Sequence, residues 1–237
     1  MGSSRRGAGQ GARHFQPAAR GLYRALQQIR ADLRADDLGV SDDYRHSAFW
    51  QDRYEQGAAG WDKGQAAPPL VRALAGDGAA PGARVLVPGC GYGHEALHLA
   101  RLGYQVVAID FAPAAVARLR QRAADLSLEA VECDIFALPA NYHGLFDLVV
   151  EHTCFCAIPL DRRDDYAGVM ARVLRPGGTL LGLFWELGEE GGPPHNTSRR
   201  DLQRHFGSLF ELGEAEQPGD SFAGRRDEEW LVRMTKK

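Results

Sequence analysis

The fold of this 237-residue chain is decided by the stretch Val85-Leu86-Val87-Pro88-Gly89-Cys90-Gly91-Tyr92-Gly93. Its first three residues predict a short buried strand. The alternating glycines predict a tight turn, because glycine tolerates positive φ and lets a backbone approach a ligand closely. A helix is expected to follow as far as about Leu102. A strand, a glycine turn and a helix in this order are typical of a nucleotide-binding crevice.

Downstream of the glycine turn, predicted strands and helices alternate. The predicted strands are 105–109, 128–133, 146–151 and 179–185, and the predicted helices are 114–125 and 164–174. This alternation predicts a mostly parallel sheet with helices on both faces. A helix at 198–210 with Ser198 as its N-cap is then followed by two candidate strands, 210–215 and 230–234. The predicted fold is therefore α/β and Rossmann-like, with an antiparallel C-terminal hairpin at one edge.

Two carboxylates follow predicted strands. Asp110 ends the second strand, 21 residues after Gly89, where it can accept hydrogen bonds from both hydroxyls of a ribose. Asp134 ends the third strand, where it can contact an adenine amino group while Ile135 and Phe136 pack on the ring. The carboxyl ends of parallel strands meet at one edge, which is the expected ligand crevice. The predicted cofactor-binding residues on this edge are Gly89, Gly91, Gly93, Asp110, Asp134 and Ile135.

The spacing of the glycines distinguishes between nucleotides. The turn reads G-x-G-x-G, whereas the dinucleotide fingerprint G-x-G-x-x-G requires a glycine at position 94, which is His94 here. An NAD-dependent reductase is therefore disfavoured. The shorter turn suits S-adenosyl-L-methionine (SAM), which has no pyrophosphate to seat on a helix. A SAM-binding regulator without catalysis is a non-enzyme alternative, but the intact turn and both carboxylates argue against a degenerate domain.

Several motifs resemble one family of SAM-dependent enzymes. Val87-Pro88-Gly89-Cys90-Gly91 resembles the glycine motif of the thiopurine S-methyltransferase family, and most closely that of its halide/thiol methyltransferase branch. Methyltransferases in general usually carry an acidic residue where this chain has Val87. Further matches lie at 49–57, 61–64, 146–148, 153–158 and 191–194, so that the resemblance runs from about residue 46 to the C-terminus.

The resemblance implies a class I methyltransferase with further SAM contacts in an aromatic segment. The residues implied in addition to the strand-end group are Trp50, Tyr54, Trp61 and His152. An aromatic ring face attracts a cation such as a sulfonium by about 0.5–2 kcal/mol. The alternative for Trp50 and Trp61 is simple core packing. The resemblance also implies a small acceptor: a thiol, hydrosulfide or halide.

Methyl transfer from SAM is an in-line displacement that needs positioning and exclusion of water more than a strong acid. The candidates for favouring an anionic nucleophile, and hence the predicted catalytic residues, are His152 and Arg226. Arg225 is an alternative to its neighbour, and either arginine can instead be a solvated hairpin charge. A metalloid oxyanion or a small natural product is the alternative acceptor class, because one scaffold hosts many acceptors.

The chain divides into three predicted parts. Residues 1–17 are predicted to be a disordered basic tail, 18–64 an N-terminal helix with an aromatic cofactor-covering segment, and 65–237 the SAM-binding domain. The first 31 residues contain six arginines and no acid, which is also the composition of a mitochondrial transit peptide. A cytoplasmic location is the main expectation and a mitochondrial one the alternative.

Composition limits the partners of this chain. The net charge of −3 disfavours nucleic acid as a partner, and no run approaches the roughly 18 apolar residues of a membrane span. The cysteines Cys90, Cys133, Cys154 and Cys156 form no C-x-x-C pair, so that no metal site and no disulfide framework is predicted. Cys154 and Cys156 share a strand face and are expected to be buried packing residues. We expect a monomer.

Overall fold

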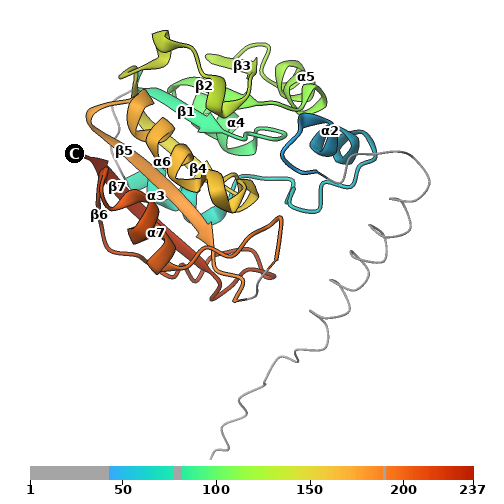
Figure 1. The fold of residues 1–237 in the computed structure, drawn as a ribbon. Helices are drawn as coiled ribbons and strands as arrows, with labels where there is room; N and C mark the ends of the chain where they lie inside the picture. Colours follow the sequence, from blue (N-terminus) through green and yellow to red (C-terminus); the bar gives the residue numbers. More distant parts are fainter. Residues whose placement is uncertain (1–42, 77–81, 189–190) are drawn as a thin grey trace, which may run out of the picture. The chain divides into compact units, whose positions relative to one another are not determined.

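A computed structural model describes residues 43–76, 82–188 and 191–237 (Figure 1). The predicted tail at 1–17 and the predicted helix within 18–42 lie outside the described residues. The described part contains a seven-stranded sheet in the order β3-β2-β1-β4-β5-β7-β6. The strands are β1 (Arg84–Pro88), β2 (Gln105–Asp110), β3 (Leu128–Glu132), β4 (Phe146–His152), β5 (Leu174–Trp185), β6 (Phe210–Leu212) and β7 (Glu229–Lys236).

The pairing of these strands confirms the predicted fold class. Strands β1 to β5 pair in parallel, whereas β7 pairs antiparallel with both β5 and β6. The C-terminal hairpin is therefore present. In the sheet, the last strand β7 lies between β5 and β6, so that β6 is the edge strand.

Helices cover both faces of the sheet. Its helices are α2 (Ser47–Glu55), α3 (Pro68–Gly76), α4 (His94–Arg101), α5 (Pro113–Arg122), α6 (Arg163–Val173) and α7 (Arg199–Phe206). Short 3₁₀ turns lie at η1 (Ile135–Ala137), η2 (Ala140–Tyr142), η3 (Phe155–Ala157) and η4 (Leu160–Arg162). Apolar residues of α3, α4 and α5 form one buried cluster with the sheet, and those of α6 and α7 form a second on the opposite face (Figure 1). No helix among the described residues is long and apolar enough to cross a membrane.

Two predicted boundaries differ from the structure for identifiable reasons. Strand β5 begins at Leu174, directly after α6, because Leu174 already pairs with Phe146 of β4. The sequence Pro176-Gly177-Gly178 is therefore an irregular part of a strand and not the loop before it. Helix α7 has the predicted N-cap, since the Ser198 and Asp201 side chains form a capping box. It ends at Phe206, and Gly207 rather than Phe210 closes it.

Candidate active site

The parallel strands bring most of the predicted residues to one edge. The carboxyl ends of β3, β2, β1 and β4 are neighbours in the sheet, and they carry Asp134, Asp110, the glycine turn and His152 respectively. Four segments spread over the sequence thus converge, which is the usual position of a ligand in an open α/β sheet.

The glycine turn between β1 and α4 is tightly packed. Gly89, Gly91 and Gly93 have φ values of 53°, 52° and 74°, a region that side chains rarely adopt. A Cβ on Gly89 would lie 2.6 Å from the sulfur of Cys154, and one on Gly93 would lie 2.3 Å from Leu119 Cδ1. Both the backbone conformation and the neighbours therefore demand glycine at these positions.

Asp110 ties the glycine turn to the turn after β2. Its Oδ2 accepts a hydrogen bond of 2.9 Å from the Gly91 amide, and its Oδ1 accepts one of 2.9 Å from the Ala112 amide. Burial raises the pKa of this carboxyl, and the backbone amides of Ala112 and Gly91 oppose the increase. The two oxygens are held in place and each retains a lone pair, so that they are arranged to accept the hydroxyls of a ribose.

The aromatic segment lies against the glycine turn. The ring of Tyr54 is 5.5 Å from that of Trp61 and 5.1 Å from that of Tyr92, and Trp50 is 5.3 Å from Trp61. A Cβ on Gly91 would lie 3.0 Å from the Tyr54 hydroxyl oxygen. Burial, followed by the charge of Asp110, raises the pKa of Tyr54 well above its ordinary value.

Helix α2, which carries Trp50 and Tyr54, is hydrogen-bonded to the segments on either side of it. The Gln51 side chain accepts a 2.8 Å hydrogen bond from the Ala114 amide at the start of α5, and the Trp50 indole donates to the Tyr44 carbonyl at 2.8 Å. Three predicted SAM contacts, Trp50, Tyr54 and Trp61, are thus brought together beside the turn and Asp110.

Asp134 and Ile135 lie one strand farther out, at the start of η1. Asp134 is exposed, and its Oδ1 accepts a 2.9 Å hydrogen bond from the Phe136 amide. Ile135 and Phe136 are half-buried. Both residues follow β3, the strand that pairs with β2, which carries Asp110.

His152 at the end of β4 is held between a carboxylate and a guanidinium. Its Nδ1 lies 2.9 Å from Glu95 Oε1, and its Nε2 lies 3.3 Å from Arg225 Nη1. The ring of His152 thus lies between an acceptor, the Glu95 carboxylate, and a donor, the Arg225 guanidinium. Burial favours the neutral form of Glu95, but the contact with His152 and the Ala67 amide outweigh it and lower the pKa of Glu95 to about 2.

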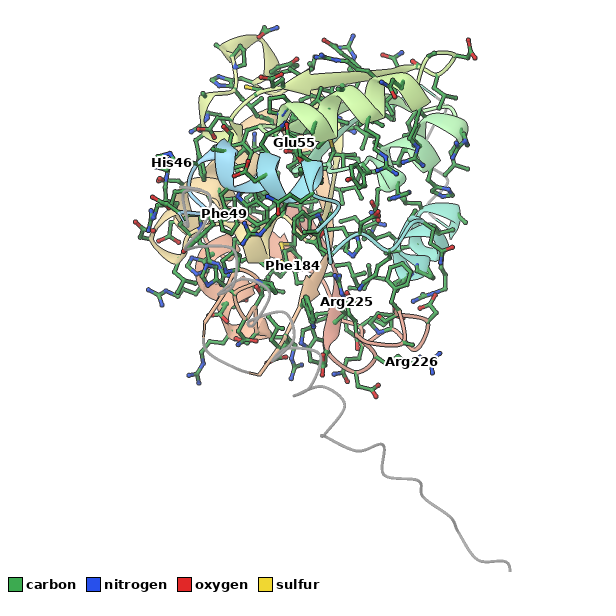
Figure 2. All side chains as sticks on the ribbon, turned by 90° about the vertical axis from the view of Figure 1, so that its right-hand side faces the viewer. His46, Phe49, Glu55, Phe184, Arg225 and Arg226 are labelled. Atoms are coloured by element: carbon green, nitrogen blue, oxygen red, sulfur yellow. The ribbon has the colours of Figure 1, made fainter. Side chains whose placement is uncertain are left out.

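The structure brings Arg225, and not Arg226, to His152. Arg225 is buried, with 2% of its surface exposed, and its guanidinium also lies 3.2 Å from Glu229 Oε1 and 4.3 Å from the centre of the Trp185 ring. Arg226 is exposed and points away at the edge of the molecule (Figure 2). Consecutive side chains of the loop diverge, so that only one of the two arginines reaches the strand end.

The sequence analysis missed two carboxylates at this site. Glu95 in the first turn of α4 accepts from His152, and Glu151 precedes His152 on β4 and points to the opposite face. Glu151 is 1% exposed, and burial raises its pKa to about 7 although backbone amides oppose the increase. A glutamate inside an otherwise apolar strand was the available signal for Glu151. Nothing local pointed to Glu95.

The residues on this edge fit the groups of SAM. The Asp110 carboxylate matches the ribose hydroxyls, the glycine turn allows close backbone approach, and the aromatic cluster suits a sulfonium. Within the described ranges, no three His, Cys, Asp or Glu side chains gather as a metal site would require.

Comparison with known proteins gives a consistent result. The family described as Thiopurine S-methyltransferase (TPMT) matches residues 45–237. The chain is 31% identical over 195 residues to thiocyanate methyltransferase 1 of Brassica oleracea, covering 79% of this chain and 84% of the relative. It is 33% identical to the probable thiol methyltransferase 2 of Arabidopsis thaliana, over 67% of this chain and 71% of the relative. It is 30% identical to the thiopurine S-methyltransferase of Azotobacter vinelandii, over 73% and 87%.

Solved structures show the same fold. A Burkholderia thailandensis 1,6-didemethyltoxoflavin-N1-methyltransferase with bound S-adenosylhomocysteine superposes with a TM-score of 0.64 at 19% identity, covering 81% of this chain and 87% of that one. A TehB-like SAM-dependent methyltransferase from Corynebacterium glutamicum superposes with a TM-score of 0.60 at 21% identity, covering 81% and 99%. The fold is that of class I methyltransferases.

Proposed function

Because this chain belongs to the thiopurine S-methyltransferase family and is a SAM-dependent methyltransferase, we propose that it methylates a small sulfur nucleophile or a halide. The acceptor class comprises thiols, hydrosulfide, thiocyanate and iodide. Two relatives named for thiols and thiocyanate support this class.

The chain's own residues would bind SAM, orient it and exclude water from the site. SAM supplies a methyl group activated by a sulfonium. Asp110 would hold its ribose, Asp134 and Ile135 its adenine, and Trp50, Tyr54 and Trp61 would cover the site. Covering matters because water weakens every electrostatic contact with the reacting groups.

The observation that carries the acceptor class is the state of Arg225. Its guanidinium is buried at the end of β4, and its Nε atom has no hydrogen-bond partner among the described residues. A buried donor without an acceptor is rare in folded proteins, and a bound acceptor molecule would satisfy it. Arg225 pairs with Glu229 through Nη1, and its remaining Nε–H is a charge-assisted donor that favours an anionic acceptor. Sulfur is anionic near neutral pH more readily than oxygen.

Turnover across a panel of acceptors tests this proposal. S-adenosylhomocysteine release is measured with thiols, hydrosulfide, thiocyanate, iodide, a thiopurine, an alcohol and an amine. We expect turnover of sulfur or halide acceptors and none of the alcohol or amine. Efficient methylation of hydroxyl or amine groups, a metalloid oxyanion or a natural product, without any sulfur or halide turnover, would refute the acceptor class. SAM binding without turnover of any acceptor would point to a non-catalytic binding protein.

Two single variants identify the arginine that acts. Arg225→Ala should reduce turnover more than it reduces S-adenosylhomocysteine affinity, because it removes the buried donor from the acceptor side. Arg226→Ala is the matched comparison one residue away, on the surface. Loss of turnover in Arg226→Ala with normal turnover in Arg225→Ala would assign the role to Arg226. His152→Ala should behave like Arg225→Ala, since the two side chains are hydrogen-bonded.

A further inference from the structure

The two carboxyl oxygens of Glu151 differ in their hydrogen bonding: Oε1 accepts hydrogen bonds from the backbone, and Oε2 has no partner among the described residues. Oε1 accepts hydrogen bonds from the amides of Cys154, at 2.9 Å, and Phe155, at 2.7 Å, which holds the turn after β4. Oε2 is buried and has no partner among the described residues. A purely structural role as a turn cap accounts for Oε1 alone, and leaves a buried acceptor atom unpaired at the cost of its hydration.

Oε2 belongs to a side chain that lines a narrow cleft at the ends of β4 and β5. The cleft is lined by Glu151, Thr153, Cys156, Leu183, Phe184, Trp185 and Thr197. The Glu151 side chain in this cleft is 1% exposed, so that its carboxyl is largely shielded from water. Thr153 and Trp185 are the part-exposed residues of its lining.

Two features tie this cleft to the reacting end of the site. Trp185 lines the cleft, and the Arg225 guanidinium lies 4.3 Å from the centre of the Trp185 ring. Thr153 has a φ of 61°, although its side chain is β-branched. Strained backbone of this kind is concentrated at functional sites.

The charged and titratable groups around Glu151 come from three elements. His152 on β4 and Arg163 on α6 both favour its ionised form. The thiols of Cys154 and Cys156 lie near it in the turn after β4, and the hydroxyl of Tyr166 lies near it on α6. Burial is the largest influence and raises the pKa of Glu151 to about 7. The pKa values of the Cys154, Cys156 and Tyr166 groups are raised as well, mainly by burial. Among Glu151, Cys154, Cys156 and Tyr166, burial brings only the pKa of Glu151 close to neutrality.

We propose that Glu151 is the general base of this enzyme, which takes the proton of a thiol acceptor on its Oε2 oxygen. The inference rests on the proposed function and deepens it. The S–H bond of the thiol breaks and an O–H bond forms on Glu151, while the sulfur keeps the electron pair. That pair forms the new bond to the methyl carbon as the bond between the methyl and the sulfonium breaks. The proton then passes from Glu151 to solvent.

This role predicts opposite pH dependences for two acceptors. A thiol needs the ionised carboxylate, so its kcat/KM should rise as Glu151 loses its proton around pH 7 and level off above it. Thiocyanate carries no proton to remove and is repelled by the carboxylate. Its kcat/KM should therefore be highest below about pH 7 and fall above it.

The experiment compares these two acceptors in the wild-type chain and in Glu151→Gln. In the variant, thiol turnover at neutral pH should fall by about 100-fold, the lower end of what a positioned base contributes. Its remaining rate should follow the ionisation of the free thiol. The thiocyanate profile should become flat and keep the wild-type value found at low pH. Glu151→Asp, which retains a carboxylate, should recover part of the thiol rate. Calorimetric binding of S-adenosylhomocysteine establishes that each variant is folded.

The outcomes separate this inference from the proposed function. Wild-type profiles that rise together for both acceptors would overturn the role of Glu151 without any variant. Parallel losses for thiol and thiocyanate in a folded Glu151→Gln would overturn it too, since a structural cap affects both acceptors alike. A wild-type chain that methylates neither acceptor would overturn the proposed function itself, and the inference with it.

Discussion

Replacing Glu151 by glutamine should change how the stability of this protein depends on pH. Folding raises the pKa of this buried carboxyl from its ordinary value of 4.5 to about 7. Between these two values the folded chain holds a proton that the unfolded chain has lost. The folded state therefore binds more protons, and the free energy of unfolding decreases as pH rises through this window.

The size of the effect follows from the difference in pKa. Each unit corresponds to about 1.36 kcal/mol, so the wild-type protein should lose about 3 kcal/mol from this group between about pH 4 and about pH 8. Glu151→Gln cannot ionise and keeps an oxygen for the amides of Cys154 and Phe155. The stability of the variant relative to wild type should therefore improve by about 3 kcal/mol from acid to alkaline pH, whatever the offset between them.

Urea unfolding followed by tryptophan fluorescence at both pH values measures this difference. Other titrating groups cancel when the variant is compared with wild type at each pH. Glu211→Gln, an exposed glutamate on β6, is the matched control and should show no comparable trend. A stability difference between Glu151→Gln and wild type that stays constant with pH, or one in which the variant loses stability relative to wild type as pH rises, would refute the argument from burial.

Three further predictions concern the cofactor site. Asp110→Ala should weaken S-adenosylhomocysteine binding by more than about 1 kcal/mol, because the fixed carboxylate is lost, and calorimetry showing wild-type affinity would remove Asp110 from the site. Deleting residues 1–17 should leave turnover intact, whereas deleting 1–64 should abolish cofactor binding with the aromatic segment; binding that survives the longer deletion would contradict the covering role. Gly93→Ala should destabilise the protein by about 1–3 kcal/mol in urea unfolding, since its Cβ would clash with Leu119 at 2.3 Å and its φ is 74°, and an unchanged midpoint would count against the packing of the turn.

The fold was largely predictable because its signals are local. Short apolar runs, glycine turns and helical segments alternate along the chain, and each is recognisable within about ten residues. The position of Asp110 was predictable for the same reason: it directly ends a strand, and parallel strands bring their carboxyl ends to one edge. The boundaries were less predictable, since Leu174 joins β5 only through its pairing with Phe146 of β4.

The acceptor side was not predictable because its contacts join distant parts of the chain. Glu95 is 57 residues from His152, and Arg225 is 73 residues from it. Periodicity and spacing carry no information on which of two adjacent arginines turns inward. The family resemblance implied a basic residue near the C-terminus, and only the structure shows that it is Arg225 whose side chain reaches His152.

The sequence by itself thus determined the α/β class, the glycine turn and the carboxylates at the strand ends, because these depend on residues that are neighbours along the chain. Tertiary structure alone decided that Arg225 rather than Arg226 meets His152, and that Glu151 keeps a buried, unpaired oxygen. Both depend on burial, which is a property of what the rest of the chain places around a side chain. The same burial that hides these groups from sequence analysis shifts the proton affinity of Glu151 and leaves the Arg225 donor without a partner.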